Sequence, residues 1–124
     1  MSPQTEAYLT QCSPEVAAML RKLWHLIQDI AEAEGATPLR ETLAWGQPSL
    51  KSPNGTALRL AETKAGDAAL LVHCATTVMA EAQMRPSDLR FDGNRGIRLD
   101  PTAPLPTADL APVIRRALTY HESR

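Results

Sequence analysis

A change in the spacing of apolar residues limits the folds open to this sequence more than any other feature. Between Ser13 and Gly35 the apolar residues recur at steps of three and four, which is the spacing of one face of a helix. Ser13 and Pro14 suit the N-cap and first turn of this helix, and Gly35 suits its end. Further along the chain the apolar residues alternate with polar ones, as in strands, so helices and strands must share one core. The apolar face of the helix comprises Val16, Met19, Leu20, Leu23, Trp24, Ile27, Ile30 and Ala31.

The segment after this helix predicts a short second helix. Thr37 and Pro38 repeat the signal of a cap followed by proline, and Leu39 and Leu43 are four residues apart. Gly46 would end this helix.

The rest of the chain combines strand patterns with two helical segments. Leu58 and Leu60 alternate with Arg59, which predicts a half-buried strand, and the run AALLVHC predicts a strand covered on both sides. Residues 90–99 predict a hairpin around Asp92, Gly93 and Asn94. Helices are expected over 75–84 and, because proline is tolerated only in the first turn, from 109 to about 118.

These elements predict an α+β fold in which helices pack on one face of a mainly antiparallel sheet of about five strands. A chain of 124 residues is the size of one ordinary domain. We therefore expect residues 1–12 to form a polar N-terminal arm and residues 13–122 to form the single domain.

Composition and charge exclude several partners. A net charge of -1 with no run of basic residues gives no attraction to nucleic acid or to an anionic membrane surface. No apolar stretch approaches the roughly 20 residues of a membrane span, and the N-terminal sequence lacks the pattern of a signal peptide, which favours a cytoplasmic location. In that compartment Cys12 and Cys74 are expected to be free thiols and not a disulfide.

The chain contains four separated motifs, which are, in order, ETLAWGQPSL, LVHCATT, FDGNRGIRL and ALTYH. Together they resemble the YdhG-like family, a domain of unknown function known as DUF1801, and the resemblance covers nearly the whole chain. It implies a compact α+β domain, and some family members have been linked to a frataxin-like role in intracellular iron delivery. Leu50 and Val72 stand where similar chains carry aromatic residues, so a ligand that depends on those rings is not expected here.

Trp45 has two interpretations. Gly46 and Pro48 interrupt regular structure beside it, so the indole either fills the core at a helix-to-strand corner or lines a pocket. In the second interpretation Gln47 and Ser49 form the polar rim of that pocket.

Histidine and cysteine do not form a metal-binding pattern. His73 and Cys74 are adjacent, so a regular strand would point them to opposite faces. The others, His25, His121 and Cys12, are scattered singly, so no metal site is predicted. Cys74 is expected to be a small buried residue, although a thiol nucleophile assisted by His121 is the alternative.

An iron-handling role would require a ridge of carboxylates. Asp29, Glu32 and Glu34 end the first helix, and Glu41 follows nearby. Such a cluster is usually a solvated helix face, and 14 acidic residues against 13 basic ones give little acidic excess.

The sheet offers a different chemical signal. If the apolar residues of its strands face the helices, Arg59, Arg90 and Arg98 lie on the opposite face, with Arg95 in a nearby turn. Arginine side chains suit carboxylate or phosphate groups. The alternative is a solvated face on which Asp92 and Glu62 neutralise these arginines.

The sequence thus favours a binding module for a small anionic molecule or an acidic segment of a protein partner, without a cofactor. An iron chaperone is the alternative, with iron as its cargo, and an enzyme ranks third because no nucleophile, base and orienting group can be named together. The oligomeric state is open, and a homodimer is compatible with the sequence. The candidate ligand-binding residues are Trp45, Gln47, Ser49, His73, Asn94, Arg95, Arg98 and His121.

Overall fold

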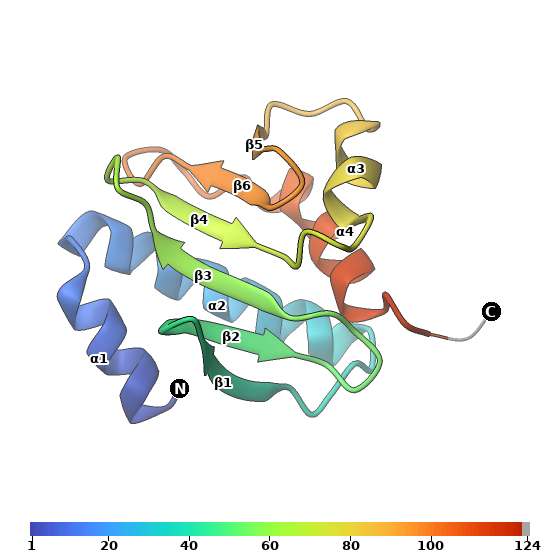
Figure 1. Ribbon diagram of the computed structural model, residues 1–124, viewed down its shortest axis with the longest axis horizontal. Coiled ribbons are helices and arrows are strands. Elements are labelled where there is room, and N and C mark those ends of the chain that lie inside the picture. Colours follow the sequence, from blue (N-terminus) through green and yellow to red (C-terminus); the bar gives the residue numbers. More distant parts are fainter. Residues whose placement is uncertain (123–124) are drawn as a thin grey trace.

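A computed structural model, which describes residues 1–122, shows helices on one face of an antiparallel sheet (Figure 1). The sheet has six strands in the order β1-β2-β3-β4-β6-β5, and every neighbouring pair is antiparallel. The helices are α1 (Pro3–Gln11), α2 (Pro14–Ala33), α3 (Val78–Gln83) and α4 (Thr107–Leu118). The strands are β1 (Arg40–Ala44), β2 (Gln47–Lys51), β3 (Leu58–Glu62), β4 (Ala68–Leu71), β5 (Arg90–Asp92) and β6 (Gly96–Leu99). The predicted α+β class is confirmed, with one strand more than expected.

Helices α2 and α4 supply the apolar layer that covers the sheet. The Ser13 hydroxyl caps α2 by accepting a hydrogen bond from the backbone N–H of Val16, and all eight residues of the predicted apolar face are buried. Helix α4 begins two residues earlier than predicted and keeps Pro112 inside it. Only one N–H is lost at Pro112, and the buried side chains of α4 hold the helix against α2.

The predicted second helix is wrong, because its residues form strand β1. Ala44 lies opposite Gln47, so Trp45 and Gly46 alone make the turn into β2. Both residues have positive φ angles, 57° and 75°, as a two-residue hairpin turn requires. A helix of so few residues is marginal by itself, whereas β1 gains a complete ladder along β2.

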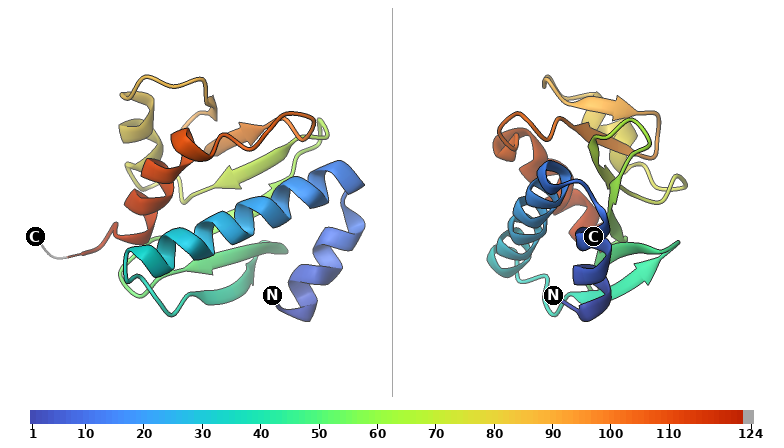
Figure 2. Two further views of the ribbon diagram at one scale, coloured as in Figure 1. Left: turned by 180° about the vertical axis from the view of Figure 1, so that it is seen from behind. Right: turned by 90° about the vertical axis from the view of Figure 1, so that its left-hand side faces the viewer.

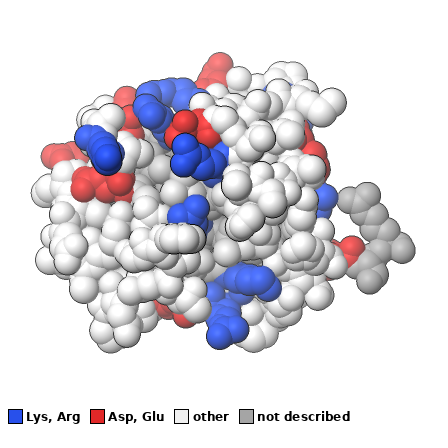
Figure 3. Space-filling model, in the orientation of Figure 1, with Lys and Arg blue, Asp and Glu red and all other residues white. Residues whose placement is uncertain are grey.

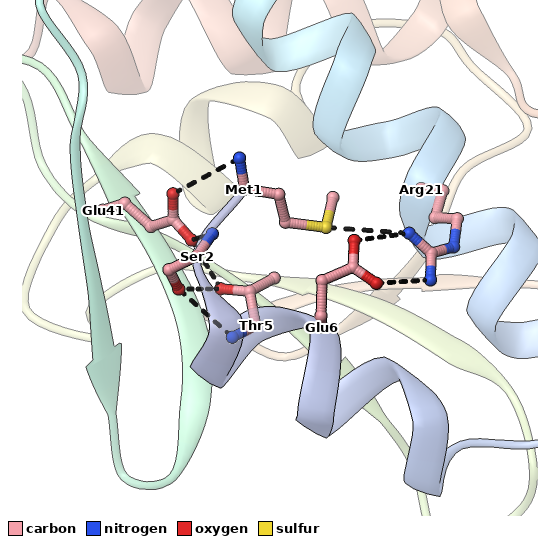
Figure 4. Close-up of polar contacts among 6 residues, drawn as sticks. All are labelled: Met1, Ser2, Thr5, Glu6, Arg21 and Glu41. Atoms are coloured by element: carbon pink, nitrogen blue, oxygen red, sulfur yellow. Dashed lines mark hydrogen bonds and ion pairs between the residues drawn. The ribbon is translucent and has the colours of Figure 1, made fainter.

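The segment predicted to be a polar N-terminal arm instead contains a helix, α1. The Ser2 hydroxyl caps α1 at the N–H of Thr5, and Thr5 and Leu9 are buried. The Glu41 carboxylate on β1 accepts hydrogen bonds from the Ser2 N–H at 2.6 Å and from the Thr5 hydroxyl at 2.7 Å (Figure 4). The local sequence does not predict this docking, because Glu41 is 39 residues from Ser2 and 36 from Thr5.

One face of the sheet packs on the helices, and the other is open. Figure 2 (right view) shows the helices α2 and α4 on one side and the β1–β2 hairpin projecting away from them. Leu58, Leu60 and Leu70 face the helices and are buried. Alternate residues on the same strands, such as Arg59 and Ala69, therefore face the open side.

Candidate functional site

The open face of the sheet contains a cavity of about 390 Å³. Its walls come from five strands, β2, β3, β4, β5 and β6, and from the turns at their ends. The lining residues are Gln47, Arg59, Ala61, Glu62, Thr63, Lys64, Ala69, Leu71, Asp92, Arg95, Ile97 and Arg98.

Two alanines explain why the cavity lies where it does. Ala61 on β3 is directly opposite Ala69 on β4, and Ala69 is opposite Arg98 on β6. Cross-strand neighbours share a face, so these two short side chains make a low floor between longer ones. The neighbouring row contains Arg59 opposite Leu71, which raises the wall on that side.

Four cationic side chains line the cavity: Arg59, Lys64, Arg95 and Arg98. Figure 3, which looks onto this open face, shows lysine and arginine gathered there with acidic groups among them. Within residues 1–122 none of the four has a carboxylate oxygen within 4.0 Å. The Arg59 guanidinium donates a hydrogen bond of 2.9 Å to the amide oxygen of Gln47, which ties β3 to β2 at the cavity wall.

The backbone of Arg95 is fixed while its side chain is exposed. Its N–H donates to the Asp92 carbonyl at 3.1 Å, and its own carbonyl accepts from the Val72 N–H at 2.7 Å. The turn between β5 and β6 therefore fixes the backbone from which the Arg95 side chain extends at the edge of the cavity.

The alternative prediction was a solvated face on which Asp92 and Glu62 neutralise the arginines. These two acids form no ion pair with a described arginine. The Arg90 guanidinium lies 3.7 Å from the carboxylate of Asp67, which belongs to the β3–β4 turn. The carboxylate of Glu62 accepts a hydrogen bond from the Ser13 N–H at 3.0 Å, at the start of α2. Asp92 lines the cavity without an ion pair to a described residue. The cavity thus has four cations and two acids, Glu62 and Asp92.

Neither interpretation of Trp45 is correct. The side chain is 90% exposed at the tip of the β1–β2 hairpin, so it neither fills the core nor lines the cavity. A left-handed conformation costs an L-residue about 1 to 2 kcal/mol, and asparagine is the residue usually found at this turn position. Trp45 therefore has an unfavourable backbone conformation and an unburied indole at the same place.

The other candidate residues are dispersed. Gln47, Arg95 and Arg98 meet at the cavity, but Ser49, His73, Asn94 and His121 are not part of its lining. Ser49 is buried within β2, and Asn94 is exposed in the β5–β6 turn.

The two histidines lie beyond the ends of strand β4 and helix α4. His73 is exposed after β4, where its Nδ1 accepts a hydrogen bond from the Ala75 N–H. The His121 N–H donates to the Asn54 carbonyl, and its ring meets Tyr120 edge-on. The structure therefore does not bring the tryptophan, the histidine strand and the Asn94 turn together around one cavity.

Sequence reasoning missed the floor of the cavity, Ala61 and Ala69, and two of its cations as site residues. Of these two cations, Arg59 was predicted on the open face but outside the site, and Lys64 was not predicted to bind a ligand. The sequence did contain a signal for this floor. The alternation of side chains along β3 and β4 places Ala61 and Ala69 on the open face of adjacent central strands.

Both thiols are free in the structure, and Cys74 is exposed, not buried as predicted. It follows β4 in the loop toward α3, because the strand ends at Leu71, earlier than predicted. Burial raises the pKa of the Cys12 thiol. Among residues 1–122, no three histidine, cysteine, aspartate or glutamate side chains gather in a way that could hold a metal ion.

A second polar cluster joins the end of α4 to the start of α3. The Tyr120 hydroxyl accepts a hydrogen bond from the Thr77 N–H at 2.9 Å, and the Arg116 guanidinium lies 4.5 Å from the centre of the tyrosine ring. Arg116 also donates to the Glu81 carboxylate at 2.8 Å. Hydrogen bonds from Thr77 lower the pKa of Tyr120. These contacts are satisfied within the chain and fasten α3 to α4.

Comparisons with known proteins support the fold and leave the ligand undefined. A scan against models of protein families and a search of curated proteins both found no match. Among solved structures, the chain is similar to the crystal structure of YdhG, a protein of the DUF1801 family from Bacillus subtilis, with a TM-score of 0.62. The match has 15% sequence identity and covers 90% of this chain and 85% of that one. The YdhG-like fold predicted from the motifs is therefore confirmed. None of the helices described is both long and apolar enough to cross a membrane.

Proposed function

We propose that the protein binds a small molecule that carries a carboxylate or phosphate group, in the cavity on the open face of its sheet. The observation that carries this proposal is the set of unneutralised cations, Arg59, Lys64, Arg95 and Arg98, around one cavity. An arginine fork donates two parallel hydrogen bonds to such an anion, which provides both strength and orientation.

The floor of the cavity suits an apolar part of the same ligand. Ala61 and Ala69 are each 3% exposed at the bottom of the cavity, and the half-buried Leu71 adds aliphatic surface beside them. A volume of about 390 Å³ lies at the lower end of the range for small-molecule sites, roughly 300 to 1,000 Å³. We therefore expect a compact ligand with an anionic end and an apolar body.

The test is a thermal-shift screen followed by titration calorimetry. Inorganic phosphate and citrate represent the two anionic groups without an apolar body, and phenyl phosphate and benzoate represent them with one. A ligand that binds only the native state raises the melting temperature. If none of the four binds below millimolar concentration, the proposal is overturned.

Variants of two arginines locate the binding. Arg95→Ala should change the free energy of unfolding by less than about 0.5 kcal/mol, because the side chain is exposed. It should weaken the best anion by about 1.5 to 3 kcal/mol, the strength of a hydrogen bond to a charged group. Arg98→Lys keeps the charge but loses the fork, so it should also weaken binding. Arg85→Ala removes an exposed cation outside the cavity and is the matched control.

A steric variant tests the cavity without changing any charge. Ala69→Leu fills the floor between Ala61 and Arg98 and should abolish binding of the anion that has an apolar body. Unchanged affinity in Ala69→Leu would place the anion elsewhere on the surface.

A further inference from the structure

One acidic side chain of the cavity is left without a partner. Asp92 is exposed at the end of β5, and its carboxylate forms no ion pair with a described residue. The other acid of the lining, Glu62, is engaged elsewhere, because its carboxylate accepts a hydrogen bond of 3.0 Å from the Ser13 N–H at the start of α2. Asp92 is therefore the acid of the lining that is left for a ligand.

The arginines nearest to Asp92 on the sheet do not neutralise it. Arg90 and Asp92 are two residues apart on β5, so their side chains share one face. The Arg90 guanidinium nevertheless lies 3.7 Å from the carboxylate of Asp67, in the β3–β4 turn. Arg98 is opposite Arg90, which makes it a diagonal neighbour of Asp92 with about 7 to 8 Å between Cα atoms. Asp92 and Arg98 thus lie close together without an ion pair.

The turn after β5 adds a second cation beside Asp92. The Arg95 N–H donates to the Asp92 carbonyl at 3.1 Å, so residues 92–95 form a β-turn whose end Cα atoms lie within about 7 Å. The side-chain amide of Gln83 on α3 donates to the Gly93 carbonyl at 2.9 Å and steadies this turn. The Asp92 carboxylate and the Arg95 guanidinium are still more than 4.0 Å apart. The cavity therefore presents an acid next to two bases without joining them.

A ligand that carries only an anionic group does not suit this arrangement. Arg95 and Arg98 would attract its charge, while Asp92 would repel it from nearly the same distance. A ligand that also carries an ammonium group turns this repulsion into attraction, because the ammonium donates to Asp92 while the anionic group accepts from the arginines. The two charges of the ligand must lie close together, since Asp92 is within about 8 Å of both arginines.

We propose that the ligand is a zwitterion, an α-amino acid with an apolar side chain, an inference that rests on the function proposed above. In an α-amino acid the ammonium and the carboxylate are attached to one carbon, which matches the short separation between Asp92 and the arginines. The apolar side chain extends over Ala61 and Ala69, which lie in one row with Arg98. A cavity of about 390 Å³ holds one such molecule.

A matched pair of ligands tests this inference. Phenylalanine and 3-phenylpropionate have the same skeleton, but only phenylalanine has the amine. Titration calorimetry on the wild type should show phenylalanine binding about five- to tenfold more tightly, between the strength of an exposed ion pair and that of a hydrogen bond to a charged group. If Asp92 takes no part, the cations of the cavity repel the ammonium and 3-phenylpropionate binds more tightly.

A variant of Asp92 locates the ammonium. Asp92→Asn keeps the shape of the side chain and suits a turn, so the protein should remain folded, as circular dichroism checks. Phenylalanine should then bind no more tightly than 3-phenylpropionate, whose own affinity should stay equal or increase. Asp88→Asn removes an exposed acid outside the cavity and is the matched control, which should keep the preference for phenylalanine.

The outcomes distinguish this inference from the function on which it rests. If 3-phenylpropionate binds and phenylalanine gains less than about threefold, which is weaker than an exposed ion pair, the zwitterion is wrong while the anion site stands. The zwitterion is equally wrong if Asp92→Asn keeps the preference for phenylalanine. If neither ligand binds below millimolar concentration, the inference is overturned, and the proposed function is overturned with it only if the anions of its own screen also fail.

Discussion

The two tryptophans lie in opposite environments, although each stands close to apolar residues in the sequence. Trp24 is 2% exposed on α2, inside the layer between the helices and the sheet, whereas Trp45 is 90% exposed at a hairpin tip. The seven other apolar residues of the α2 face determine the position of Trp24 because together they define one side of a helix. Trp45 belongs to no such face, so the fold leaves its ring in solvent. A tryptophan in the sequence therefore predicts a buried side chain only when the neighbouring apolar residues repeat with the period of a helix or a strand.

The largest expected difference between the two regions is in stability. Trp24→Ala should reduce the free energy of unfolding by about 3 to 5 kcal/mol, because it opens a cavity in the core. Trp24→Phe should cost less, since the Trp24 Nε1–H has no hydrogen-bond partner among the described residues and none is lost. Urea unfolding followed by circular dichroism measures both. Trp45→Ala should stay within about 0.5 kcal/mol, and equal losses for the two alanine variants would contradict the comparison.

An intermediate effect is expected where the β1–β2 hairpin is attached to α1. Glu41→Gln keeps the shape of the side chain but removes the charge that accepts from Ser2 and Thr5. Hydrogen bonds to a charged group contribute about 1.5 to 3 kcal/mol, so hydrogen exchange in α1 should accelerate while exchange in α2 stays unchanged. Uniform acceleration in both helices would mean that α1 is not a separate unit of the fold.

Lowering the pH should accelerate hydrogen exchange in α1, as Glu41→Gln does, because it removes the same charge. Partial burial raises the pKa of Glu41, but the hydrogen bonds from Ser2 and Thr5 outweigh it and hold the pKa below the ordinary value of 4.5. The stabilisation is therefore complete above about pH 4.5 and is lost as the pH falls through the lowered pKa. Protection of α1 should decline below about pH 4.5 in the wild type, and this decline should be absent in Glu41→Gln.

The smallest expected effect is a gain in stability at the hairpin tip. Trp45→Asn places a residue that tolerates a positive φ at the first turn position, before Gly46. The monomer should become more stable by about 0.5 to 1 kcal/mol, the lower part of the cost of a left-handed residue. Urea unfolding followed by circular dichroism measures this gain. A loss of stability would show that the indole packs on the monomer surface.

The sequence by itself determined the two amphipathic helices and the central strands. The apolar stripes of α2 and α4 and the alternation in β3 and β6 are local patterns, and all their predicted core residues are buried. These patterns also placed Arg59 and Arg98 on the open face, since a strand has a period of two.

Tertiary structure decided the rest, because it depended on partners distant in the chain. The segment from Arg40 to Ala44 is a strand because β2 pairs with it, and residues 3–11 are a docked helix because Glu41 holds Ser2 and Thr5. The cavity exists because sheet pairing brings Ala61, Ala69 and Arg98 into one row. His73 and His121 lie outside the cavity because they follow the ends of β4 and α4. Local periodicity fixes which way a side chain faces, but only the register between strands fixes which side chains meet.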